Sequence, residues 1–135
     1  MLERLSTHVS NFSFATLIGG SSLAQQRTEL YKKPDCIVAT TGRLLDHLQN
    51  TQSFSIEELD YLVLDEADKL LEMGFKEELL KILEFSKKKT RQTVMVSATL
   101  NQDIKELAEI TLNKPLTFSV SQQQNTTSES KLKLK

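Results

Sequence analysis

The stretch that decides the fold is Tyr61-Leu62-Val63-Leu64-Asp65-Glu66-Ala67-Asp68, an apolar run followed at once by acidic residues. Short, nearly continuous apolar runs are typical of strands that are buried on both faces of a parallel sheet. In open α/β sheets, ligands bind in the crevice outside the carboxyl ends of the strands. The junction therefore predicts a buried strand that brings Asp65 and Glu66 to a ligand-binding edge.

Strand-like and helix-like patterns alternate on both sides of this junction. Ser22 with Gln25 three residues later resembles a capping box, and Asn101 is of a residue type preferred at helix N-caps. Strands that alternate with helices indicate an α/β domain with a parallel sheet. Besides residues 61–64, we predict strands at 14–18, 36–39, 93–96 and 116–120, and helices within 1–10, 22–31, 42–49, 75–83 and 101–114.

Composition limits the classes of function. The chain has 135 residues, enough for one domain, and a net charge of -1, so any nucleic-acid site must be a local patch. Tryptophan is absent and aromatic residues make up 6%, which argues against a base-stacking surface. The single cysteine, Cys36, cannot form an internal disulfide. We find neither a signal peptide nor a membrane-spanning segment, which predicts an intracellular protein with no membrane partner.

Two adjacent carboxylates after a buried strand suit phosphoryl-transfer chemistry. The first can hold Mg²⁺ on a nucleotide phosphate through water, and the second can orient the attacking water, as in a Walker-B site. The alternative is that Asp65 and Glu66 merely begin the next helix, where negative charge suits the helix dipole. The full tetrad of residues 65–68 favours the first interpretation, since a chain of this length contains it by chance in about one case in a thousand.

The tetrad and three other segments resemble the DEAD-box RNA helicases. Residues 63–75, with their trailing Gly74-Phe75, resemble motif II, and Ser97-Ala98-Thr99 resembles motif III. Residues 39–43 are similar to motif Ib, and Gly19-Gly20 matches the family's GG motif. Their order and spacing agree over about residues 1–120. Residues 45–54 look most like the nucleolar ribosome-assembly branch of the family.

The resemblance implies roles for the acidic tetrad and for motif III. Asp65 would bind Mg²⁺ through water, and Glu66 would be the catalytic base or water-orienting group. Asp68 would hydrogen-bond to Ser97 and Thr99, whose short hydroxyl groups can reach a carboxylate, and this link would couple nucleotide state to domain closure. The alternative for Ser97 and Thr99 is an ordinary helix entry after a strand.

The resemblance also implies an RNA site. It assigns contacts with the RNA sugar-phosphate backbone to Gly19, Gly20, Thr40, Gly42 and Arg43. Glycine lets a backbone approach closely and arginine forks onto phosphate, and such contacts are independent of RNA sequence. The alternatives are an ordinary glycine turn and a solvated helix arginine. The family usually has proline where this chain has Thr41, so the start of this helix is less preorganised.

Several family motifs have no counterpart in the chain. It contains no GxxxxGK[ST] phosphate loop, no adenine-reading Q motif and no Pro-Thr-Arg-Glu-Leu motif. We therefore expect an incomplete RecA-like parallel sheet with helices on both faces, which lacks the phosphate-loop strand and the following strand. The remaining five strands should fall into three groups: the first two, the next two and the last alone. We predict a partial helicase ATP-binding domain at residues 1–120 and a polar linker or disordered tail at 121–135.

These observations lead to a functional hypothesis with two rivals. The first hypothesis is a fragment of an ATP-dependent RNA helicase that uses ATP and Mg²⁺, acts in ribosome biogenesis in the nucleus or nucleolus, and contacts RNA and ribonucleoprotein partners. A truncated, non-catalytic module that binds RNA or a partner is the alternative, and another Walker-B ATPase is a third. The isolated chain should bind ATP weakly or not at all, so saturable millimolar or tighter binding in calorimetry would contradict this expectation.

Three other features receive plainer interpretations. Lys87-Lys88-Lys89 is a basic cluster that could contact nucleic acid, but a solvated loop is the better interpretation of so short a run. His8 and His47 stand alone in the sequence, and neither is assigned a metal.

Overall fold

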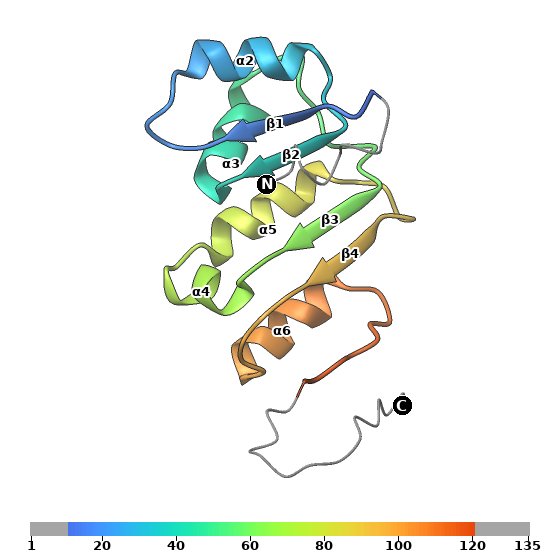
Figure 1. The fold of residues 1–135 in the computed structure, drawn as a ribbon. Coiled ribbons are helices and arrows are strands. Elements are labelled where there is room, and N and C mark those ends of the chain that lie inside the picture. The colour runs from blue at the N-terminus through green and yellow to red at the C-terminus, as the bar shows by residue number, and fades with distance from the viewer. Residues whose placement is uncertain (1–10, 121–135) are drawn as a thin grey trace, which may run out of the picture.

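The computed structural model describes residues 11–120, so the helix predicted at residues 1–10 and the tail at 121–135 lie outside the described residues. Strands and helices alternate along the chain, as the sequence predicts (Figure 1). The strands are β1 (Phe14–Leu17), β2 (Cys36–Ala39), β3 (Tyr61–Leu64) and β4 (Gln92–Met95). The helices are α2 (Leu23–Tyr31), α3 (Thr41–Asn50), α4 (Ala67–Glu72), α5 (Lys76–Phe85) and α6 (Gln102–Thr111).

The strands form two separate parallel pairs. β1 pairs with β2, with Phe14 opposite Cys36, and β3 pairs with β4, with Tyr61 opposite Gln92. The grouping predicted for the first four strands is therefore confirmed. All four strands run in the same direction, so their carboxyl ends lie at one edge (Figure 1).

The fifth predicted strand, at residues 116–120, is wrong. The described chain has no strand there, and Leu116, Phe118 and Val120 are exposed. Alternating apolar residues form a strand only when a neighbouring strand takes up the backbone hydrogen bonds, and this segment pairs with none in the described part of the chain.

The helix boundaries follow from local chemistry. Ser22 Oγ accepts a hydrogen bond from the Gln25 N–H at 3.5 Å, and Asn101 Oδ1 accepts one from the Ile104 N–H at 2.9 Å, so both predicted N-caps are confirmed. Gly74, at φ +83°, ends α4, and its N–H bonds to the Leu71 carbonyl. The next N–H bonds back to the Leu70 carbonyl, which completes a Schellman motif and separates α4 from α5.

Two apolar clusters hold the described helices against the strands. The first joins β3 to α5 and α6 through Leu64, Leu79 and Leu107, and Met95 of β4 packs against it. The second joins α3 to α5 through Leu48 and Ile82. The expected α/β class is confirmed. Within residues 11–120, the packed helices cover one face of the strands.

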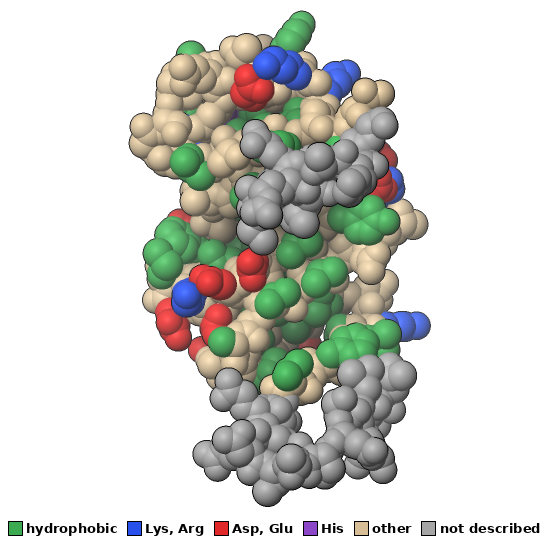
Figure 2. Space-filling model, viewed as in Figure 1, with side chains coloured by type: hydrophobic (Ala, Val, Ile, Leu, Met, Phe, Trp, Pro, Cys, Tyr) green, Lys and Arg blue, Asp and Glu red, His purple; other side chains and the backbone are tan. Residues whose placement is uncertain are grey.

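The opposite face of the strands carries exposed apolar side chains. Val38, Val63 and Val94 are all exposed there, at alternate positions from the residues that the helices bury. Figure 2 shows hydrophobic side chains gathered on the viewed face. A second layer of helices, which was also expected, is not among the described elements.

Candidate functional site

The acidic tetrad lies at the carboxyl end of β3, where the sequence predicts it. Asp65 and Glu66 are exposed, and Asp65 Oδ1 accepts a hydrogen bond from the Glu66 N–H at 2.9 Å. Glu66 has φ 49° and ψ 47°, the left-handed conformation, which costs a non-glycine residue roughly 1–2 kcal/mol. This local strain directs the chain sharply from β3 into α4, and strained backbone of this kind is concentrated at functional sites.

Backbone hydrogen bonds place the tetrad beside the Ser-Ala-Thr segment. The Val96 N–H donates to the Leu64 carbonyl at 2.8 Å, and the Ala67 N–H donates to the Val96 carbonyl at 3.0 Å. The ladder between β3 and β4 thus continues past both strands. Residues 65–68 and 97–99 therefore leave the same edge next to each other.

The predicted link from Asp68 to the motif III hydroxyls stays a prediction. Asp68 is buried, and its Oδ1 accepts a hydrogen bond from the Lys69 N–H at 3.1 Å. Ser97 Oγ accepts a hydrogen bond from the Thr99 N–H at 3.4 Å. In this structure of residues 11–120, Asp68 makes no hydrogen bond to either hydroxyl, although the two segments are adjacent.

The carboxylates fit an indirect role at a metal. Asp65 is exposed to solvent, which suits water-mediated contact with Mg²⁺. Residues 11–120 contain no group of three acidic, histidine or cysteine side chains that could form a direct metal cage. Glu66 pairs with Lys69 at 3.0 Å, and this hydrogen bond raises the pKa of the Lys69 amine. Since both side chains are exposed, water competes with the pair and Glu66 can be released.

The predicted RNA residues come together at the carboxyl ends of β1 and β2. The Thr40 N–H donates to the Leu17 carbonyl at 3.0 Å, which sets the Gly19-Gly20 turn beside the start of α3. A Cβ atom at Gly19 or Gly42 would meet no atom within 4 Å, so packing within the described chain does not require glycine there. Open space over a backbone is what close approach of a ligand needs. Gly20 differs, since its φ of +78° itself favours glycine.

A polar network behind this turn was missed by the sequence analysis. Arg43 Nη1 donates to the Ser21 carbonyl at 3.1 Å and to Gln26 Oε1 at 3.3 Å. His47 Nε2 is 3.1 Å from the same Gln26 oxygen, and His47 Nδ1 is 3.0 Å from Thr51 Oγ1. Arg43 is thus not simply a solvated helix residue. The signal was present in the polar spacing 43, 47 and 51, which places one side chain on each turn of a single helix face.

The network makes stability depend on pH. Burial lowers the pKa of His47 below its usual 6.5, and the charges of Arg43 and Arg27 lower it further, while Asp46 opposes the shift. The unfolded chain therefore binds the proton more readily than the folded chain does. We expect the free energy of unfolding to be highest above about pH 6.5 and to fall as the solution is acidified below it. Urea denaturation across this range measures the slope, and His47→Asn should flatten it.

The basic cluster at residues 87–89 has local partners. Lys87 pairs with Glu57 at 3.1 Å, and Lys88 pairs with Asp60 at 2.6 Å. These pairs lie where the chain enters β3 and β4, at the edge opposite the acidic tetrad and the glycine turn. They favour the interpretation of a solvated loop over that of a nucleic-acid contact.

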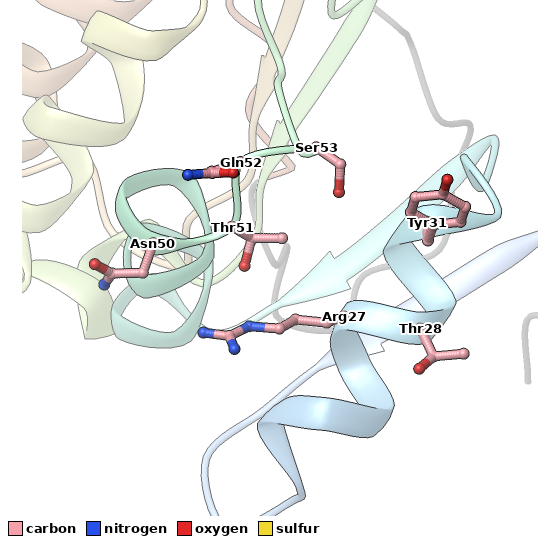
Figure 3. A pocket seen from close by; sticks show the side chains of 7 residues that line it. All are labelled: Arg27, Thr28, Tyr31, Asn50, Thr51, Gln52 and Ser53. Carbon is pink, nitrogen blue, oxygen red and sulfur yellow. The ribbon is translucent and has the colours of Figure 1, made fainter.

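An open groove of about 590 Å³ lies between the ends of α2 and α3. Figure 3 shows Arg27 extending from α2 toward Asn50 and Thr51, with Tyr31 at the other end of the groove. None of the residues predicted for either site lines it. No helix in residues 11–120 is long and apolar enough to cross a membrane.

Comparisons with known proteins agree on one family. The model for the DEAD/DEAH box helicase family matches residues 1–107. The ATP-dependent RNA helicase DRS1 of Meyerozyma guilliermondii is 47% identical over 119 residues, which is 88% of this chain and 17% of that protein. The probable ATP-dependent RNA helicase ddx27 of Dictyostelium discoideum is 47% identical over 111 residues, which is 82% of this chain and 14% of that protein.

Solved structures give the same result. A DEAD box protein from Methanococcus jannaschii is 34% identical, with a TM-score of 0.70 over 77% of this chain and 28% of that one. The yeast DEAD-box splicing factor Prp28 is 34% identical, with a TM-score of 0.71 over 77% of this chain and 24% of its own. The chain spans less than a fifth of these curated relatives. It belongs to the DEAD/DEAH box helicase family.

Proposed function

We propose that this chain is part of an ATP-dependent RNA helicase and supplies two portions of its working surface. One is the magnesium and water half of the ATPase site, and the other is a patch that holds the RNA backbone. The observation that carries the proposal is their placement, since Asp65, Glu66, the Gly19-Gly20 turn and Arg43 all follow the carboxyl ends of parallel strands. Ligands bind at this edge in open α/β sheets.

The residues of the tetrad have separate tasks in this proposal. The Glu66 carboxylate accepts a hydrogen bond from the attacking water and orients it toward the terminal phosphate, after release from Lys69. Asp65 would help to hold Mg²⁺ through water, and Mg²⁺ would supply charge neutralisation on the phosphates. Asp68 carries the state of this site to Ser97 and Thr99, whose segment lies beside it.

The RNA patch would contact the sugar-phosphate backbone of RNA and would not contact the bases. Gly19 and Gly42 have open space above them, and Thr40 and Gly42 flank the amino terminus of α3, where free N–H groups favour phosphate. Arg43 supplies a local positive charge, so the chain does not need a net positive charge to bind the RNA backbone. Residues 45–54 are similar to the ribosome-assembly branch of the family. This similarity supports a helicase that acts on ribonucleoprotein particles in the nucleus and has protein partners there.

A graft tests the proposal. The matching 119-residue segment of the M. guilliermondii helicase is replaced by that of this chain, and separation of a short RNA duplex is followed with and without ATP. We expect separation only with ATP, and the unmodified helicase is the positive control. A folded graft that binds RNA without hydrolysing ATP would favour the non-catalytic alternative, a module that only binds.

A further inference from the structure

The Gly19-Gly20 turn is held at both ends by side chains from elsewhere. Gln26 Nε2 donates to the Ile18 carbonyl at 2.9 Å, just before the two glycines. Arg43 Nη1 donates to the Ser21 carbonyl at 3.1 Å, just after them. Glycine has little conformational preference of its own, so these two bonds help to select the shape of the turn.

The two side chains that hold the turn are also bonded to each other. Gln26 Oε1 accepts from Arg43 Nη1 at 3.3 Å and faces His47 Nε2 at 3.1 Å. Because this oxygen can only accept, His47 Nε2 must carry the proton and donate it. In the neutral ring, His47 Nδ1 then accepts from the Thr51 hydroxyl, so the ring is held from both sides.

Apart from Arg43, the polar side chains of this network are buried, unlike most polar side chains on a protein surface. Gln26 is 5% exposed and His47 is 1% exposed, yet both side-chain atoms of the Gln26 amide and both ring nitrogens of His47 have partners. Buried polar groups are costly unless they are bonded, and an apolar residue could fill either position. The network ends at Arg43, which is only half-buried and whose Nε and Nη2 make no hydrogen bond within residues 11–120.

We propose that Gln26 and His47 are positioning residues. They hold the Gly19-Gly20 turn and Arg43 together as one protein surface that binds the RNA backbone. The inference rests on the proposed function, because it takes Arg43 and the turn as RNA contacts. Gln26 bonds to both segments at once, and His47 fixes the amide of Gln26. Neither residue needs to touch RNA itself, and the two loops meet the backbone as one preorganised unit.

A double-mutant cycle on the 135-residue chain tests the proposal. The probe is a short fluorescein-labelled oligouridylate, and affinity is read by anisotropy. We expect Arg43→Ala and Gln26→Met each to weaken binding roughly five- to tenfold. Because Gln26 acts partly through Arg43 and partly through its own bond to the turn, the double variant should lose less binding free energy than the two single losses added together. Gln25→Leu, an exposed neighbour on the same helix, is the matched control and should bind like the original chain.

The outcomes separate the two ideas. If Arg43→Ala weakens binding but Gln26→Met does not, or if the two effects simply add, the positioning role is wrong and the RNA site stands. If Arg43→Ala has no effect, or the chain does not bind the probe, the RNA assignment fails. The positioning role is then decided by the amide NMR signals of Gly19 and Gly20, which Gln26→Met should shift and Gln25→Leu should not. Unchanged signals would overturn it.

A second variant keeps the test decisive if Gln26→Met does not fold. Gln26→Glu retains an acceptor for Arg43 and His47, removes the donor to the Ile18 carbonyl and adds a negative charge. The Gly19 and Gly20 signals should shift while those of residues 44–50 in α3 remain in place. Glycine signals identical to those of the original chain would contradict the proposed lock.

Discussion

Replacing Leu107 with alanine is expected to lower the free energy of unfolding by about 2–5 kcal/mol. Leu107 is 0% exposed and lies in α6, where it packs in one cluster with Leu64 of β3 and Leu79 of α5. Removing its side chain leaves a cavity at the point where three elements meet. Domains of this size are stable by only about 5–15 kcal/mol, so this loss is a large fraction of the total free energy of unfolding.

Circular dichroism during urea denaturation measures this loss. Ile110→Ala is the matched control, because Ile110 is on the same helix and is 58% exposed. Its effect should stay within about 0.5 kcal/mol, as is usual for surface positions. Equal effects at the two positions would show that α6 does not pack against β3 and α5 as described.

Local patterns were enough to predict most of the elements. Ser22 and Asn101 marked helix starts because an N-cap depends on the side chain of the cap residue and on a backbone N–H three positions later, both of which are local. The strand before Asp65 was predicted because apolar runs of this kind are local too. The acidic tetrad and the RNA segments were identified by their resemblance to motifs of the family, and each of them lies just after a predicted strand.

Features that depend on distant partners were predicted less well. The strand at residues 116–120 was wrong because pairing needs a neighbour that a pattern cannot supply. The network of Gln26, Arg43 and His47 joins residues 17 and 21 positions apart, and only the packing of α2 beside α3 brings them together. His47 therefore looked isolated in the sequence although it is bonded on both sides in the fold.

The exposed apolar face has a consequence for handling the chain. Val63 and Val94 lie on adjacent paired strands, and neither is covered by a described helix. Val38 extends the same kind of surface onto the other pair of strands. Large exposed apolar patches mark interaction sites or aggregation liabilities. The stability measurements above should therefore be made at low protein concentration, so that association is not mistaken for folding.

The second large effect is expected from Glu66→Gln in the grafted helicase. A carboxylate that orients or accepts a proton from the attacking water contributes about 10²–10⁴-fold to the rate, and glutamine keeps the size while losing the charge. We expect kcat for ATP hydrolysis to fall by that factor while RNA affinity is unchanged, because Glu66 follows β3 and the RNA segments follow β1 and β2. Such a pattern identifies a group needed in the transition state.

The control for this variant is Glu72→Gln. Glu72 is the last residue of α4, is exposed, and carries the same charge one helix length from the strand end. It should hydrolyse ATP at the rate of the unmodified graft, which removes net charge as an explanation. If Glu66→Gln still hydrolyses ATP at the original rate, the role of Glu66, with its strained φ of 49°, is only to shape the turn between β3 and α4. Loss of turnover in both variants would indicate that α4 as a whole, rather than one carboxylate, supports the reaction.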